Sequence, residues 1–277
     1  CKVDIGESMF IFRIVRRLVL IICILLGAIY VYDTYQSYQG TNRVSKAHTT
    51  VEQTIEENED TLSRWERIHR IFTFREKVEA ALHQRVPRDK WVKSESIPDN
   101  AKRALVAIED KRYYKHGAID VLGVTRAFYV NTVAGETVEG GSTITQQLVK
   151  NLFLSSKRTM SRKAEEAILA VEMEHYYSKD EILEIYVNTS YFGAGYYGIG
   201  PATQGYYGKT PEKLSLNEAA FLAGVPNAPS AYNPYEHYEL AVQRRNIVLR
   251  KMVYNGDITQ EEAIIVYNER LNVKDKK

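Results

Sequence analysis

The stretch Gly140-Gly141-Ser142-Thr143-Ile144-Thr145-Gln146-Gln147-Leu148-Val149-Lys150-Asn151 decides how the rest of the fold is interpreted. It begins with two glycines and a Ser/Thr pair, and it continues with helix-forming residues. This order is typical of a loop that enters a helix, because Ser142 or Thr143 can accept hydrogen bonds from the free N–H groups of the first turn. The stretch therefore predicts a loop followed by a helix N-terminus.

At helical spacing the predicted helix has an apolar face and a polar face. Ile144, Leu148 and Leu152 lie on the apolar face, which can pack into a core. The other face offers a hydroxyl, two amides and an ammonium, which suit sugar hydroxyls and phosphate; its members are Thr143, Gln146, Gln147 and Lys150. Taken alone, an ordinary amphipathic helix explains the pattern equally well.

Composition limits the class of protein. The chain has 277 residues, enough for one large domain or two small ones, and 44% of them are hydrophobic. Its net charge is +2 and no long Lys/Arg stripe is present, so we expect no nucleic-acid partner. Cys1 and Cys23 cannot form a disulfide framework or a cysteine-based metal site.

Residues 18–32 form an uninterrupted apolar and aromatic run. A full span needs roughly 20 residues, a length that is reached if Tyr35 and Tyr38 act as interfacial anchors. Basic residues precede the run, so we expect a cytoplasmic N-terminus (1–17), a single-pass transmembrane anchor (18–35) and an extracytoplasmic remainder. A cleaved signal peptide is the alternative, but no small-x-small cleavage site follows the run.

The rest of the chain is predicted to be helical. Residues 36–95 indicate a juxtamembrane linker and an amphipathic helix, in which the stretch from Arg64 to Arg75 either rests on a bilayer or packs against a core. The main domain is expected at 96–277. Its glycine-rich segment 193–208 is predicted to be non-helical, and helices are predicted over 101–110, 121–133, 161–177, 179–187, 214–225 and 241–254.

Glu109 and Asp110 end an apolar helix pattern. A carboxylate in that position can be partly desolvated, which raises its pKa toward the range of a general base. The alternative is a solvated acidic pair beside Lys111 and Arg112, which the two residues in isolation favour.

A basic run from Arg158 to Lys163 enters the next helix pattern. Arg162 and Glu166 are four residues apart, so a surface ion pair worth a few tenths of a kcal/mol is one interpretation. The functional interpretation gathers basic side chains around a diphosphate, with Glu166 holding a cation or ordering the guanidinium groups; the basic residues are Lys150, Arg158, Arg162 and Lys163.

Five successive segments resemble, in order, the motifs of the peptidoglycan glycosyltransferases, the bacterial murein polymerases of glycosyltransferase family 51. The similarity covers roughly residues 97–255, and Tyr113 and Ala118 stand where the family usually has Phe and Gly. The segments are Glu109-Asp110-x-x-Tyr113-x-x-His116-x-Ala118-x-Asp120, the block Gly140 to Asn151, Arg162-Lys163-x-x-Glu166, Lys179-x-Glu181-Ile182-Leu183-Glu184-x-Tyr186-x-Asn188, and Leu216-x-Glu218-Ala219-Ala220-x-Leu222-Ala223-Gly224.

The resemblance implies a mainly α fold, with a lysozyme-like helical lobe and a smaller membrane-facing lobe, preceded by the single transmembrane helix. It implies that residues from about 120 to 139 border the acceptor side and move on binding. The implied location is the bacterial cell membrane, and the implied role is cell-wall synthesis.

The resemblance also implies a reaction on lipid II. Glu109 would remove the proton from the 4-hydroxyl of the acceptor GlcNAc, which attacks C1 of the donor MurNAc with inversion as the polyprenyl diphosphate leaves. Glu166 would be the second catalytic glutamate, with Mg²⁺ or Mn²⁺ at the diphosphate in the region of Glu166, and with no organic cofactor. Substrate binding falls to Asp110, Ser142, Thr143, Gln146, Gln147, Lys150, Arg158, Arg162 and Lys163, while His116 and Asn188 are expected to be structural.

Three alternatives differ in activity. No Ser-x-x-Lys element of a transpeptidase is present, so we expect a monofunctional polymerase, although the glycosyltransferase part of a bifunctional penicillin-binding protein would look the same. A lysozyme-like hydrolase or lytic transglycosylase also uses a glutamate on a helical fold, but it needs no basic cluster. A glycan-binding scaffold would not need the two glutamates. Expected partners are lipid II, the nascent strand, the bilayer, and transpeptidases or other cell-wall synthesis proteins.

Overall fold

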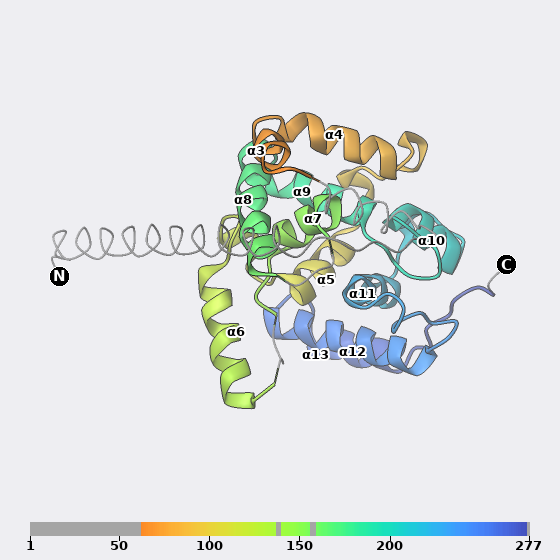
Figure 1. Cartoon of the computed structure of the whole chain (residues 1–277). Helices are drawn as coiled ribbons and strands as arrows, with labels where there is room; N and C mark the ends of the chain where they lie inside the picture. Colours follow the sequence, from red (N-terminus) through yellow and green to blue (C-terminus); the bar gives the residue numbers. More distant parts are fainter. Residues whose placement is uncertain (1–61, 137–139, 156–158, 276–277) are drawn as a thin grey trace, which may run out of the picture. The chain divides into compact units, whose positions relative to one another are not determined.

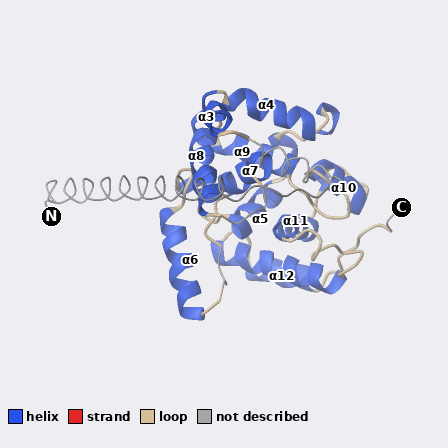
Figure 2. Ribbon diagram, in the orientation of Figure 1, coloured by secondary structure: helices blue, strands red, loops and turns tan. Residues whose placement is uncertain are grey.

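A computed structural model describes residues 62–136, 140–155 and 159–275. Within these ranges the chain forms helices joined by loops (Figure 2). The only strand-like pairing among the described residues is an isolated bridge between Tyr191 and Tyr197. The mainly α prediction is confirmed. The predicted anchor at 18–35 lies outside the described residues, and no helix inside them combines the length and apolar character needed to cross a bilayer.

Figure 1 shows the order of the helices along the chain. Short 3₁₀ turns connect several of them, at Arg88–Lys90, Ser94–Ser96, Tyr113–Lys115, Pro211–Lys213 and Val225–Asn227. The α-helices are α3 (Arg64–Phe72), α4 (Phe74–Arg85), α5 (Asp99–Glu109), α6 (Val121–Ala134), α7 (Ile144–Phe153), α8 (Met160–Tyr176), α9 (Lys179–Thr189), α10 (Ile199–Tyr207), α11 (Leu216–Gly224), α12 (Tyr238–Asn255) and α13 (Gln260–Tyr267).

The glycine-rich segment 193–208 differs from its prediction, because it contains α10. Gly198 (φ 87°) and Gly208 (φ 67°) lie just outside the two ends of this helix, where left-handed backbone suits glycine. Gly205 lies inside the helix because a Cβ there would come within 2.2 Å of the Tyr196 ring. Gly198 and Gly208 therefore mark the two ends of the helix, and Gly205 permits close packing within it. The glycines do not prevent helix formation.

The chain divides into two compact units, which we describe separately. One comprises Cys1–Leu62 and Phe153–Ile168, and its described part contains the first half of α8. The other comprises Ser63–Leu152 and Leu169–Lys277. α8 is continuous in sequence from the first unit into the second.

The larger unit is built around α5, α11 and α12, which pack against one another. Their contact faces carry small and aliphatic residues such as Ala104, Ala220 and Val248, all fully buried. Burying such faces in water is the main favourable contribution to folding. This packing fixes the end of α5, where Glu109 lies.

Residues of the fourth motif attach the segment that precedes α5 to α9. Glu184 accepts hydrogen bonds from Trp91 Nε1 and the Ser94 backbone N–H, both at 2.6 Å. Asn188 is buried, and its side-chain amide pairs with both backbone groups of Val92, each at 2.8 Å. Asn188 therefore holds the Val92 backbone against α9, and its structural role stays a prediction.

α6 has an unusual surface for a helix of a folded domain. Six of its large apolar side chains are exposed, from 44% for Val124 to 73% for Phe128. In the stretch from Arg64 to Arg75, by contrast, Phe74 is buried and Phe72 is exposed. The exposed apolar surface of the larger unit is thus concentrated on α6; its six residues are Val121, Leu122, Val124, Phe128, Tyr129 and Val133.

Candidate active site

Glu109 is the last residue of α5, and its side chain is only 6% exposed. Its Oε2 accepts a hydrogen bond from Gln147 Nε2 at 2.8 Å. The Tyr186 hydroxyl donates to Gln147 Oε1 at 3.1 Å, which fixes the orientation of the amide, so that its N–H faces the glutamate. Three helices, α5, α7 and α9, therefore set the position of one carboxylate.

Arg244 on α12 is a cation that faces this carboxylate. Its guanidinium lies 3.7 Å from Glu109 Oε1, donates through Nε to the Gly224 carbonyl at 3.0 Å, and lies over the Tyr232 ring at 5.3 Å. Sequence reasoning missed Arg244. It predicted the helix over 241–254, but nothing in the run Gln243-Arg244-Arg245 distinguished the arginine that faces the site.

The pKa of Glu109 is raised above the ordinary value for a glutamate, chiefly because burial disfavours the charged form. The hydrogen bond from Gln147 and the charges of Arg244 and Lys150 act in the opposite direction, and Asp110 adds to the rise. Glu109 Oε1 accepts no hydrogen bond from the described residues. This oxygen can therefore take a proton from a ligand hydroxyl.

Asp110 connects Glu109 to the beginning of α7. Its Oδ2 accepts the Ile144 backbone N–H at 3.2 Å, and its Oδ1 lies 2.8 Å from His116 Nε2. The second interaction ties the loop after α5 to the same carboxylate. Asp110 and His116 thus join the predicted base to the predicted glycine-rich helix entry.

The first turn of α7 confirms the predicted cap, with Thr143 as the capping residue. Gln146 N donates to Thr143 Oγ1 and Thr143 N donates to Gln146 Oε1, each at 3.1 Å. Both side chains are buried, and Thr143 Oγ1 also donates to the Ala118 carbonyl at 2.8 Å. The prediction of one shared polar face is therefore wrong for these two residues, because their polar atoms serve the cap.

The other polar residues of this stretch have different surroundings. Gln147 contacts Glu109 directly, and Lys150 lies close enough for its charge to act on that carboxylate. Ser142 is half-buried in the loop before α7. The described structure thus brings together Glu109, Asp110, His116, Gln147 and Lys150.

The two departures in the first motif are accommodated locally. Tyr113 is fully buried, and its hydroxyl donates to the Lys179 carbonyl at 2.7 Å, which satisfies a group that Phe lacks. Ala118 is not among the residues with positive φ, so the turn there does not need glycine. Both substitutions preserve the loop that carries His116.

Glu166 forms a separate cluster in the first half of α8. Its side chain is 2% exposed, Arg162 donates to its Oε2 at 3.0 Å, and Lys163 contacts its Oε1. The interpretation as a weak surface ion pair is therefore wrong, because the acceptor is buried. Arg158 lies outside the described residues.

A divalent cation bound directly by Glu166 does not fit this arrangement. Both carboxylate oxygens already have cationic partners, and a metal ion would have to displace Arg162 or Lys163. A divalent cation also favours oxygen ligands in larger number than one carboxylate offers. Glu166 therefore orders the side chains of Arg162 and Lys163 and does not hold a metal ion.

Comparison with known proteins identifies the family. A family model described as Transglycosylase matches residues 76–253, so this chain belongs to the Transglycosylase family and contains a peptidoglycan glycosyltransferase domain. The resemblance seen in the motifs is thereby confirmed. The matched range begins ahead of residue 96, and it includes nearly all of α4.

Curated relatives agree with this assignment. The chain is 48% identical over 184 residues to penicillin-binding protein 1A of Aquifex aeolicus (66% of this chain, 25% of the relative). It is 46% identical over 178 residues to penicillin-binding protein 1A of Escherichia coli (64% and 21%), and 45% identical over 181 residues to penicillin-binding protein 1F of Bacillus subtilis (65% and 25%). The chain thus spans about a quarter of the length of these relatives.

A solved structure, the 2.6 Å crystal structure of penicillin-binding protein 1A from Haemophilus influenzae, is also similar. The likeness has a TM-score of 0.42 at 24% identity, and it covers 68% of this chain and 18% of that one. At this score it adds nothing to the assignment made from the sequence.

Proposed function

We propose that this protein polymerises peptidoglycan glycan strands from lipid II. The observation that carries the proposal is Glu109, a buried carboxylate with a raised pKa, one oxygen held by Gln147, and the other without a hydrogen-bond donor among the described residues. A base of this kind suits the removal of a proton from a sugar hydroxyl. Membership of the family supplies the identity of that hydroxyl.

At the acceptor, Glu109 Oε1 takes the proton of the GlcNAc 4-hydroxyl while that oxygen attacks C1 of the donor MurNAc. Attack from the face opposite the leaving group inverts C1. Gln147 holds Oε2, so that Oε1 remains directed to the acceptor. The charge of Arg244 lowers the pKa of Glu109 against the larger effect of burial, and so favours the ionised form that accepts the proton. Asp110 and Ser142 are proposed to border this subsite.

At the donor, the departing diphosphate needs cationic partners as negative charge develops on it. We assign this role to Lys150, Arg158, Arg162 and Lys163, with Glu166 as the buried acceptor that orders the last two. No step is assigned to a metal ion, because Glu166 is fully engaged.

We further propose that the protein is held at the bacterial cell membrane by residues 18–35, with the catalytic domain outside. The apolar run of this segment supports the anchor, and the exposed apolar face of α6 supports a second contact with lipid. A membrane position would bring the domain to a lipid-linked substrate. Transpeptidases and other cell-wall synthesis proteins are the expected protein partners.

The deciding experiment incubates the purified chain with lipid II and separates the products by size. Glycan polymer is expected from the wild type, and Glu109→Gln should reduce the rate by about 10²-fold or more because it removes the general base. Circular dichroism would establish that the variant is folded. Substantial polymerisation by Glu109→Gln would remove this residue from the role of base.

The same assay separates the hydrolase alternative. A lysozyme-like hydrolase or lytic transglycosylase would leave lipid II unpolymerised and would solubilise preformed murein. Wild-type protein that clears murein without making polymer would therefore refute the proposed reaction. A lack of both activities would favour the scaffold interpretation.

A further inference from the structure

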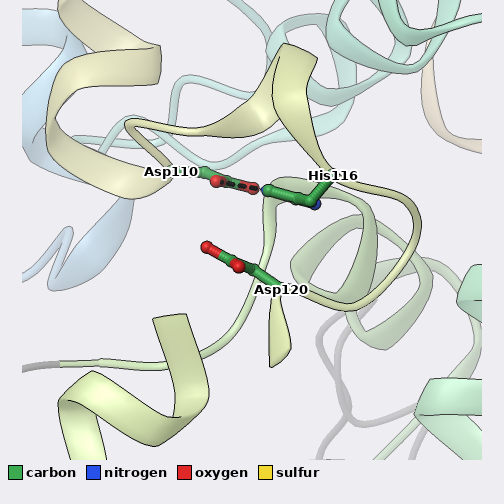
Figure 3. A group of neighbouring side chains, drawn as sticks. All are labelled: Asp110, His116 and Asp120. Carbon is green, nitrogen blue, oxygen red and sulfur yellow. Dashed lines mark hydrogen bonds and ion pairs between the residues drawn. The ribbon is translucent and has the colours of Figure 1, made fainter. Parts of the chain in front are cut away.

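Asp110, His116 and Asp120 form a cluster of metal-ligating side chains in the larger unit (Figure 3). One ligand atom from each side chain lies within 4.8 Å of the other two. Two carboxylates and one imidazole form a donor set suited to a divalent first-row transition metal. The residues come from the end of α5, the loop that follows it, and the position just before α6.

The burial of the Asp120 carboxylate is not explained by helix capping. It occupies the N-cap position of α6, yet its side chain makes no capping hydrogen bond. The residue is 7% exposed, and its Oδ1 is buried with no hydrogen-bond donor among the described residues. Leaving a carboxylate oxygen in this state is costly. Figure 3 shows the Asp120 carboxylate directed toward the Asp110–His116 pair.

His116 is oriented as a metal ligand usually is. Its Nδ1 lies 2.5 Å from the Gly117 carbonyl oxygen, which can only accept, so Nδ1 carries the proton in this contact. Nε2 faces the Asp110 carboxylate oxygen at 2.8 Å, so without a cation it donates its own proton to that oxygen. A metal ion that binds here takes the place of this Nε2 proton and lies between the two side chains. Ligating histidines commonly donate their second ring nitrogen to a backbone carbonyl in this way.

The surroundings leave room for the carboxylates to reach a cation. A Cβ at Gly123 would lie 2.5 Å from Asp120 Oδ2, so glycine makes space for this side chain. Asp110 is steadied by the Ile144 N–H at 3.2 Å, as ligating carboxylates often are. Around a tetrahedral ion, ligand atoms lie about 3.4 Å apart. Atoms that are up to 4.8 Å apart here must therefore approach by as much as about 1.4 Å, which the unbonded Asp120 Oδ1 permits.

Among the described residues, Arg112 is the charged side chain that would compete with a cation for the Asp120 carboxylate. Its Nε lies 3.6 Å from Asp120 Oδ2, too long for a hydrogen bond, and its side chain is 30% exposed. The guanidinium can turn toward solvent when a cation enters. Arg112 should therefore weaken cation binding without preventing it.

We propose that Asp110, His116 and Asp120 bind one divalent transition-metal cation, for which zinc and manganese are the fitting ions. Magnesium fits less well because it prefers oxygen ligands throughout. The cation fastens the loop from Asp110 to Asp120 to the beginning of α7. The three ligands do not include Glu166, and binding of the cation needs no glycan substrate.

The test uses the full chain in detergent, stripped with a chelator, and measures Zn²⁺ and Mn²⁺ binding by calorimetry together with thermal unfolding. We expect one site in the wild type and a rise in Tm at saturating metal. Asp120→Asn should weaken binding at least tenfold and abolish the rise in Tm. Glu79→Gln, in an exposed ion pair with Arg75, is the matched control and should bind as the wild type does.

Two further variants make the result decisive. Arg112→Gln should tighten binding because it removes the competing charge, and it keeps the proposal testable if Asp120→Asn is unfolded. Glu166→Gln should leave binding unchanged. The proposal is overturned if the wild type binds neither ion, if Arg112→Gln binds no more tightly, or if Glu166→Gln alone loses the metal, which would place the cation at Glu166.

Discussion

The position of Glu109 depends on a chain of two hydrogen bonds, from Tyr186 to Gln147 and from Gln147 to the carboxylate. We predict that Tyr186→Phe lowers kcat about tenfold with little change in KM, because the amide loses its fixed orientation and the base is misplaced. Steady-state kinetics on lipid II would measure this. Tyr177→Phe is the control, since the Tyr177 hydroxyl has no hydrogen-bond partner among the described residues. Equal rates for Tyr186→Phe and the wild type would contradict the positioning role.

Arg244 should control the pH at which Glu109 becomes an active base. Its positive charge lowers the pKa of Glu109 against the effect of burial. Because a base acts when deprotonated, loss of this charge raises the pKa and moves the acid limb of the rate profile to higher pH. Arg244→Met should show this shift in a pH–rate measurement, and the exposed Arg250→Met on the same helix should not. A limb that stays in place would show that the 3.7 Å contact has no electrostatic effect.

At the scale of the element, the adjacent residues Arg244 and Arg245 of α12 have different roles, because neighbouring side chains point about 100° apart on a helix. Arg244 faces the glutamate, whereas Arg245 is fully buried and donates through one nitrogen to Asn217 Oδ1 and the Glu269 carbonyl, each at 2.9 Å. It thereby joins α11, α12 and the chain after α13.

Arg245→Met should destabilise the fold by about 3 kcal/mol, because it leaves buried acceptors without donors. Chemical denaturation would measure the free energy of unfolding, with Arg250→Met again as the exposed control. If the two variants were equally stable, the buried arginine would contribute nothing net. In the pH–rate profile of Arg245→Met, the acid limb should stay at its wild-type pH, whereas in Arg244→Met it should shift. This difference separates a loss of stability from a change in the active site.

Helix positions followed from sequence because apolar periodicity and capping residues are local signals. The observed α6 and α9 begin at the residues predicted, and Ser178 forms a capping box with Glu181. The segment 193–208 was misjudged because glycine can bound a helix as well as break it. The predicted exposure of Thr143 and Gln146 on a shared polar face was also wrong. Their side chains point inward because of packing between elements that are distant in sequence.

The candidate site was predictable to the extent that its chemistry lies in motifs. Glu109, Gln147 and Lys150 could be named as candidates from the sequence, because they fall in segments whose order resembles a known family. Arg244 could not be found this way, since its role arises only when α12 packs beside α5. The unsatisfied oxygen of Asp120 was equally hidden, because hydrogen-bond satisfaction is a property of the folded chain.

At the scale of the whole molecule, the exposed apolar face of α6 predicts how the domain meets a bilayer. Phe128 is 73% exposed and Val133 is 71% exposed. Burial of such a side chain in lipid is worth about 1.5–3 kcal/mol, so several together would hold the helix at the membrane. A fluorophore on Phe128→Cys, with Cys1 and Cys23 replaced by Ser, should be quenched by spin labels on lipid acyl chains in nanodiscs.

The control for this measurement lies on α13. Ile265 is 62% exposed, but it is far from α6 in sequence and belongs to a helix with fewer exposed apolar residues. A fluorophore on Ile265→Cys should remain unquenched in the same nanodiscs. Equal quenching at both positions would mean that the domain has no preferred orientation on the bilayer. Quenching at neither would leave residues 18–35 as the only proposed membrane contact, and α6 would then have to bury its apolar face against protein or glycan.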